Sequence, residues 1–155
     1  MTIFLVTVTP AQAIDNLGIE RLATCQDSWL EWKQTDPVQM KKFADSFQRD
    51  FLRKEKDPFF VPKSAQTIAG LSVLQVFPES VGMGVGFSVV VGASFDKTRT
   101  SLEQKIGKFL KKCETGDNMR MCELEIAEKK TIMLMAEDNV KSTTTLVGCY
   151  YFYAK

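Results

Sequence analysis

The sequence predicts an α+β fold, in which helices pack on one face of an antiparallel sheet. Three observations indicate it: three segments with helical spacing of apolar residues, several runs rich in β-branched and aromatic residues, and short polar turns between those runs. The chain has 155 residues, which is enough for one domain with its own core. We therefore expect a single α+β domain over residues 14–155.

The N-terminal residues 1–13 differ from the start of an ordinary globular domain. An apolar run is followed by Pro10 and then by the A-x-A pattern of Ala11 to Ala13, which is typical of the end of a secretory signal. No Lys or Arg precedes Arg21, so the basic part of a signal is missing. We interpret this segment as the remnant of a signal peptide. The alternative is an N-terminal strand, because Thr, Ile and Val favour strands.

The first two helical patterns cover residues 18–33 and 35–56. In the first pattern Trp29 and Trp32 are three positions apart, so both rings can lie on one face. The second pattern opens with the capping residue Asp36 and must end before the prolines that follow it. Its apolar stripe consists of Met40, Phe43, Ala44, Phe47 and Phe51.

The third helical pattern covers residues 96–112, and the rest of the chain is dominated by strands. The apolar face of this helix consists of Leu102, Ile106, Phe109, Leu110 and Cys113. The predicted strands are residues 67–77, 85–93, 122–128, 131–137 and 143–154, with the first two as antiparallel neighbours. Residues 37–95 and 96–155 are therefore interpreted as two repeats of one plan, a helix followed by an antiparallel meander.

A glycine-rich stretch, ESVGMGVGFSVVV, covers residues 79–91. A dinucleotide-binding loop has the spacing G-x-G-x-x-G and opens a helix, because amides at the helix start bind the pyrophosphate. Here the spacing is G-x-G-x-G and a predicted strand follows. In a strand, Gly82, Gly84 and Gly86 lie on one face and leave a bare stripe of backbone. We expect the protein's own helix or aromatic rings to cover this stripe, and a bound ligand is the alternative.

The four cysteines fit an exported protein with disulfides. Cys113 and Cys122 enclose a short polar loop and can be bridged if the loop doubles back. Their pairing leaves Cys25 and Cys149 for each other, although four cysteines allow three pairings and the sequence does not choose among them. Buried free thiols in a cytosolic protein are the alternative.

Composition excludes several classes of function. The chain has no histidine, which excludes histidine-dependent catalysis and histidine-ligated metals, and we expect no metal and no cofactor. Its 20 Lys and Arg residues are interspersed with 19 Asp and Glu residues, which argues against nucleic-acid binding. No stretch has the roughly 20 apolar residues of a membrane span. Acidic residues such as Asp96 are interpreted as solvated, with a paired-carboxylate site as the alternative.

Aromatic residues are the main candidates for binding. Tyrosine and tryptophan combine apolar area with a polar tip, which is typical of protein interfaces and ligand clefts. The alternative is that these rings belong to the core or cover an edge of the sheet. Together with the glycines, the candidate binding residues are Trp29, Trp32, Gly82, Gly84, Gly86, Tyr151 and Tyr153.

The stretches FPESVGMGVGFSVVV, FDKTRTSLEQKIGK and LVGCYYFYAK resemble those of uncharacterised small exported proteins of Gram-negative bacteria. This resemblance spans most of residues 20–155 and implies no activity, ligand or functional residue. The doubled order of helix and strands is also similar, in layout only, to β-lactamase inhibitor proteins, which bind enzymes through a concave sheet. A similar layout does not imply a similar function.

These observations together predict a non-enzymatic binding module of the bacterial envelope, periplasmic or secreted. It is expected to engage a protein partner or a small apolar ligand through sheet and aromatic residues. Two alternatives stay open, an enzyme that uses carboxylates or a reactive cysteine, and a structural envelope protein. The sequence does not predict the oligomeric state.

Overall fold

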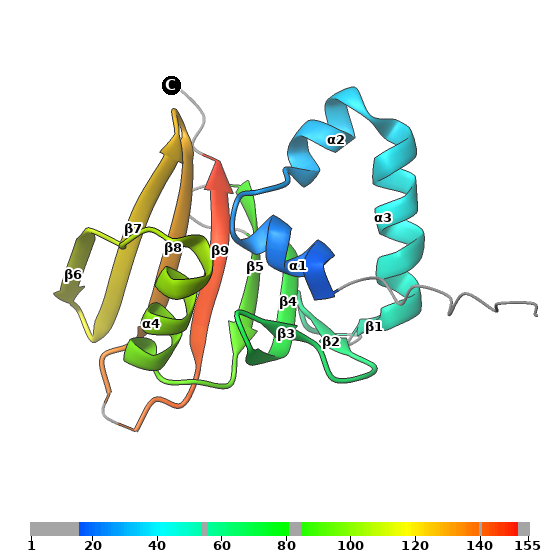
Figure 1. Ribbon diagram of the computed structural model, residues 1–155. Coiled ribbons are helices and arrows are strands. Elements are labelled where there is room, and N and C mark those ends of the chain that lie inside the picture. Colours follow the sequence, from blue (N-terminus) through cyan, green and yellow to red (C-terminus); the bar gives the residue numbers. More distant parts are fainter. Residues whose placement is uncertain (1–15, 54–55, 81–84, 140, 152–155) are drawn as a thin grey trace, which may run out of the picture.

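The computed structural model has an α+β fold, as the sequence predicts (Figure 1). It describes residues 16–53, 56–80, 85–139 and 141–151. The interpretation of residues 1–13 therefore lies outside the described residues, as do the candidates Gly82, Gly84 and Tyr153. Within the described ranges, no helix is long and apolar enough to cross a membrane.

Four helices and nine strands follow one another along the described part of the chain. The helices are α1 (Asn16–Ala23), α2 (Trp29–Thr35), α3 (Pro37–Asp50) and α4 (Phe95–Ile106). The strands are β1 (Phe51–Arg53), β2 (Phe60–Pro62), β3 (Thr67–Ile68), β4 (Leu71–Ser80), β5 (Val85–Val91), β6 (Lys112–Gly116), β7 (Met119–Ala127), β8 (Lys130–Glu137) and β9 (Thr145–Tyr151).

The strands form an antiparallel sheet in the order β1-β2-β4-β5-β9-β8-β7-β6, and the short β3 pairs with β4 outside this path. Each half of the sheet follows a helix: α3 precedes β1 to β5, and α4 precedes β6 to β9. The last strands of the two halves, β5 and β9, pair with each other at the centre. The two halves thus have similar layouts and meet along their final strands.

The helices lie on one side of the sheet, and the core lies between them and the strands (Figure 1). Phe87 of β5 contacts Phe43 of α3, with ring centroids 6.1 Å apart. Cys149 of β9 is bonded to Cys25, which follows α1. Alternate strand residues point to the helices. The fully buried ones include Phe87, Val89, Val91, Ile132, Leu134, Val147 and Cys149.

The first predicted helix, residues 18–33, is two helices in the structure. α1 ends at Ala23, and Cys25 has a φ of 58°, a left-handed conformation that does not continue a right-handed helix. The Ser28 side chain then caps α2 by accepting a hydrogen bond from the Glu31 amide (3.1 Å). The prediction of one continuous helix is wrong because this cap and the turn at Cys25 interrupt it.

The third predicted helix is shorter than its apolar pattern indicates. α4 ends at Ile106, because Gly107 has a φ of 66° and closes the helix in the left-handed conformation. Phe109 is consequently 71% exposed, whereas Leu110 is buried. Cys113 lies in β6 rather than on a helix face. The predicted face beyond Ile106 is therefore wrong.

The predicted strands are present with altered boundaries. β4 and β5 are antiparallel neighbours, as expected. A turn at Ala69 and Gly70, both with positive φ, separates β3 from β4 within residues 67–77. The edge strands β1, β2 and β6 are additional; they have only three to five residues, and β6 is exposed throughout, so no apolar alternation marks them.

The structure joins Cys25 to Cys149 and Cys113 to Cys122, so no cysteine is free. Cys25 and Cys149 are 4% and 0% exposed, whereas Cys113 lies on the exposed edge strand β6. The alternative of buried free thiols is therefore wrong. Two disulfides fit a protein that folds in an oxidising compartment outside the cytoplasm.

We expect dithiothreitol to reduce the Cys113–Cys122 disulfide before the Cys25–Cys149 disulfide in the folded protein. The attacking thiolate must reach a sulfur atom, and among the four residues only Cys113 is exposed. Brief reduction, alkylation and peptide mass spectrometry measure the order. Early labelling of Cys25 or Cys149 would contradict this expectation.

Gly86 of β5 lies opposite Tyr150 of β9, where the two central backbones approach closely. A Cβ atom at Gly86 would overlap the carbonyl oxygen of Cys149 and would lie 3.0 Å from the Tyr150 Cα. Backbone, rather than a helix or an aromatic ring, therefore occupies this space. The Tyr150 ring instead covers Gly148, since its Cε2 would lie 2.8 Å from a Cβ there.

Gly86→Ala should lower the free energy of unfolding by about 1–3 kcal/mol, because central strands must move apart to admit the methyl group. Gly92→Ala is the matched control, since the nearest atom to its Cβ would be Leu74 Cδ1 at 3.5 Å, an ordinary contact. Urea unfolding followed by circular dichroism measures both variants. Equal stability of Gly86→Ala and the wild type would show that the strands do not approach this closely.

Candidate functional site

α3 lies beside the β1–β2 end of the sheet (Figure 1), and its Phe47 ring contacts the Phe60 ring of β2. The helix starts as predicted, with Pro37 in the first turn and the Asp36 side chain accepting a hydrogen bond from the Gln39 amide (2.9 Å). Phe43 and Phe47 are four residues apart and so share one face of the helix. This start and spacing fix where the two rings meet the sheet.

Phe43 and Phe47 of α3 form a connected cluster with four other aromatic rings, one of which is Phe87 of β5. Phe47 stacks on Phe51 of β1 (4.5 Å between ring centroids) and meets the Phe60 ring of β2 edge-on (4.8 Å). Phe43 lies 5.6 Å from Phe47 and 5.9 Å from Trp32 of α2. Tilted and edge-on ring pairs add to the stability that apolar burial supplies. The cluster therefore attaches α2 and α3 to the edge of the sheet.

An open groove of about 630 Å³ runs along this cluster, between α3 and strands β1, β2 and β4. We call it the aromatic groove. Nine residues within the described ranges line it, and seven of them are apolar: Met40, Phe43, Ala44, Phe47, Pro58, Phe60 and Pro78. The other two are Gln48 and Arg53. A few polar groups beside apolar walls are typical of small-molecule sites, and the volume lies in their usual range.

The pairing of β1 with β2 places Arg53 beside the groove. Arg53 is directly opposite Phe60 in this pair, so their side chains emerge on the same face. Lys63, just after β2, donates a backbone hydrogen bond to Asp50 O (2.9 Å), and its ammonium donates one to Gln48 O (3.1 Å). These contacts fasten β2 to the end of α3 and place a second cation near Gln48.

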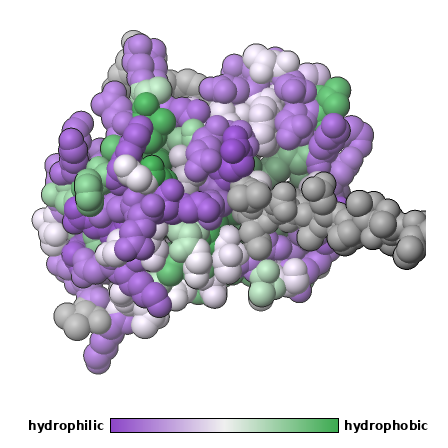
Figure 2. Space-filling model, in the orientation of Figure 1, coloured by the Kyte–Doolittle hydropathy of each residue, from purple (hydrophilic) through white to green (hydrophobic). Residues whose placement is uncertain are grey.

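The other side of the sheet has a row of apolar side chains that crosses four strands. Val90 is paired with Leu146, Leu146 with Met135, and Met135 with Met121. All four are partly exposed. The helix side, by contrast, is mostly hydrophilic at its surface, with apolar residues visible only in small separate areas (Figure 2). The row offers adaptable apolar area, because methionine side chains are flexible.

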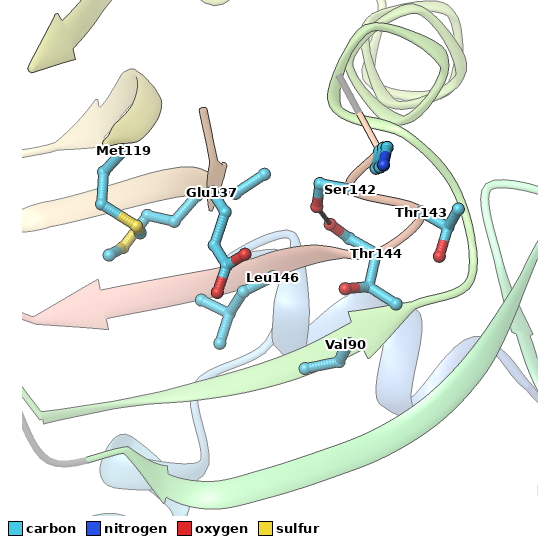
Figure 3. A pocket seen from close by; sticks show the side chains of 10 residues that line it. Val90, Met119, Glu137, Ser142, Thr143, Thr144 and Leu146 are labelled. Atoms are coloured by element: carbon cyan, nitrogen blue, oxygen red, sulfur yellow. Dashed lines mark hydrogen bonds between the residues drawn. The ribbon is translucent and has the colours of Figure 1, made fainter. Parts of the chain in front are cut away.

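A second pocket of about 420 Å³ lies along this row and is lined by three of its members, Val90, Leu146 and Met135 (Figure 3). Met119 and Glu137 lie on one side of it, and the loop residues Ser142, Thr143 and Thr144 lie on the other. The Ser142 hydroxyl donates a hydrogen bond to the Thr144 carbonyl (3.2 Å), which holds the loop in a turn. This pocket is smaller and more polar than the aromatic groove.

Asp96, which the sequence offered as a possible catalytic carboxylate, is an ion-pair partner. Arg120 donates hydrogen bonds to both of its oxygens (2.9 and 3.3 Å), and these bonds lower the pKa of the Asp96 carboxyl. The Arg120 guanidinium also lies 4.5 Å from the centre of the Phe95 ring. A lowered pKa is the opposite of what a general acid needs. Among the described residues, no cluster of His, Cys, Asp or Glu could hold a metal ion.

The candidate residues from the sequence do not form one site. Trp32 supports the aromatic groove through Phe43 without lining it. The side chain of Trp29 lies outside the described part of the structure. Gly86 lies at the central strand pair, and Tyr151 lies on the helix side near the start of α2. Their binding role therefore stays a prediction.

Tyr151 is half-buried, and its hydroxyl has no hydrogen-bond partner of ordinary geometry among the described residues. Lys130 lies 5.7 Å from the ring centre and 3.9 Å from the Glu31 carboxylate. Burial raises the pKa of Tyr151; the nearby Ser28 side chain lowers it, and the charges of Glu31 and Asp27 raise it further. Tyr151 thus stays neutral at physiological pH.

Sequence reasoning placed Phe43 and Phe47 in a helix stripe but assigned the stripe to the core. It did not identify Phe60, Arg53 or the prolines as neighbours of that stripe. The segment DPFFVP contained the available signal, since two prolines around two aromatic rings indicate an exposed turn with apolar residues. The segment alone does not show that β1 pairs with β2, and this pairing is what brings Arg53 next to Phe60.

Comparisons with known proteins found no relative: no family model, no curated protein and no solved structure matches this chain. The resemblances of sequence stretches and layout described above thus stay hypotheses. The function has to be argued from the grooves and surfaces of the chain itself.

Wild-type stability should fall more steeply than that of Tyr151→Phe as the pH rises above about 10, the ordinary tyrosine pKa. The pKa of Tyr151 is higher in the folded state than in the unfolded state. The contribution of the neutral Tyr151 hydroxyl to the free energy of unfolding is therefore complete below about pH 10 and is lost as the pH rises above it. Urea unfolding at about pH 9 and about pH 11 measures the difference. Parallel pH profiles for the two proteins would contradict a buried hydroxyl.

Proposed function

We propose that the protein is a non-enzymatic binding module of the bacterial envelope, periplasmic or secreted, that holds a small apolar ligand in the aromatic groove. The main support is the lining of the groove, in which three phenylalanine rings, a methionine, an alanine and two prolines stand beside only two polar residues. Apolar ligands bind in such sites because both surfaces leave water.

Several observations favour binding over chemistry. Each cysteine is in a disulfide, so none offers a free thiol as nucleophile. The carboxyl group of Asp96 has a lowered pKa because Arg120 binds it. None of the described residues that line the aromatic groove carries a carboxylate. Its described side chains can enclose and orient a ligand, and they include no acid–base pair.

A protein partner on the other side of the sheet is the second candidate function. The row of Val90, Leu146, Met135 and Met121 supports it, since partly exposed apolar residues that cross four strands can pack against a partner. A small ligand in the aromatic groove is favoured because this groove is larger and more apolar than the pocket along the row.

Ala44→Trp should weaken binding of the neutral fluorescent probe N-phenyl-1-naphthylamine by about tenfold or more, because the indole fills the groove. Ala44 lines the groove and is only partly buried, so the larger side chain can enter open space. Fluorescence titration of the full chain gives the dissociation constants. Thermal unfolding verifies that the variant is folded.

Val38→Trp is the matched control, because Val38 lies on the same helix, is 64% exposed and does not line the groove. It should bind the probe like the wild type. Equal probe binding by the wild type and Ala44→Trp would refute the groove as the site. If binding were instead lost in Met135→Glu, the apolar row on the other side of the sheet would be the binding surface.

A further inference from the structure

The charges around the aromatic groove indicate which kind of apolar ligand fits it. Arg53 lines the groove, and among the described residues its guanidinium makes no ion pair or hydrogen bond. None of the described residues that line the groove is Asp or Glu. The groove thus offers, within the described residues, a cation without a partner beside apolar walls.

Neighbouring acidic groups do not neutralise this cation. Asp50 accepts two hydrogen bonds from Arg49 (2.9 and 3.0 Å), and Asp45 is paired with Lys41 (2.6 Å). The ammonium of Lys63 donates to the Gln48 carbonyl and adds positive charge beside this lining residue. Asp57 and Lys56, which are both exposed, carry opposite charges. Among the described residues, the charge beside the groove is therefore positive.

The walls fit a flexible chain better than a flat ring. The Phe43 and Phe47 planes are inclined by 37°, and those of Phe47 and Phe60 by 70°, so the lining rings form no parallel slot. Met40 beside them adapts to irregular shapes. The volume of about 630 Å³ is in the range of small-molecule sites, and the groove is open to solvent.

We propose that the aromatic groove binds an anionic amphiphile, namely a free long-chain carboxylate. Its aliphatic chain lies on Phe43, Phe47 and Phe60, and its carboxylate accepts hydrogen bonds from the Arg53 guanidinium. This inference rests on the proposed function, because it names the ligand class of the same groove. Arginine suits the role, since its planar guanidinium binds a carboxylate through two parallel hydrogen bonds.

Isothermal titration calorimetry of the full chain with decanoate and with decanol tests the proposal, because the two probes differ only in the head group. Arg53→Gln should weaken decanoate binding by about tenfold, the loss expected for one charge-assisted hydrogen-bond pair. It should leave decanol binding unchanged. Added NaCl should weaken binding of decanoate and not of decanol, because salt screens exposed charges.

Two further variants separate charge from other effects. Arg53→Lys keeps the cation and should retain more decanoate affinity than Arg53→Gln. Lys41→Gln removes a cation of α3 that does not line the groove and is paired with Asp45, and this variant should bind decanoate like the wild type. Because Arg53 and Lys41 are exposed, these substitutions should leave the fold intact.

The outcomes distinguish this proposal from the function on which it rests. Equal affinity for decanoate and decanol, or unchanged decanoate binding by Arg53→Gln, would overturn the anionic ligand and leave the apolar groove in place. Failure of decanoate, decanol and the neutral naphthylamine probe to bind would overturn both. Binding to phosphatidylglycerol vesicles without binding to monomeric decanoate would overturn the free carboxylate in favour of a lipid surface.

Discussion

The pairing of β5 with β9 is the constraint on which the rest of the structure depends. It joins the two halves of the sheet and sets Phe87 directly opposite Cys149, so that both side chains point to the helices. Phe87 meets Phe43 of α3, and Cys149 is bonded to Cys25 after α1. By linking residues 124 positions apart, this disulfide stabilises the fold by about 3–5 kcal/mol through restriction of the unfolded chain. Gly86 permits the close approach on which the pairing relies.

The aromatic groove follows from where α3 lies relative to that centre. α1 packs on the central strands and is connected to α4 by the ion pair of Glu20 with Lys105 (2.8 Å), so this part of the helix layer is closed. α3 instead meets the sheet at the β1–β2 edge, where the layer ends. The edge strands β1 and β2 have only three residues each, and the groove lies between them and α3. The apolar walls consequently remain partly open to water, which is an arrangement that a ligand can complete.

Agreement between sequence and structure varied with the kind of signal. The start of α3 was confirmed because its cap, its proline and its apolar spacing all indicate the same start. The predicted end at residue 56 was wrong: α3 ends at Asp50, and Phe51 of its stripe lies in β1, where the backbone is extended. The prediction of a helix over residues 96–112 was too long. Apolar residues beyond Ile106 continue the helical spacing, but Gly107 ends the helix. The turn at Cys25 was missed for a related reason. The spacing of apolar residues does not indicate that a cysteine has a positive φ. Edge strands of three residues are too short to show alternation.

The sequence by itself determined the α+β class, the main strands, the aromatic stripe of α3 and the absence of histidine chemistry. These properties depend on composition and on periodicity within short segments, which are local. Only the tertiary structure decided which cysteines pair, that β5 lies beside β9, and that Arg53 and Phe60 lie next to Phe47. Such contacts join residues far apart in the chain, and they are selected by the packing of whole faces rather than by any local pattern.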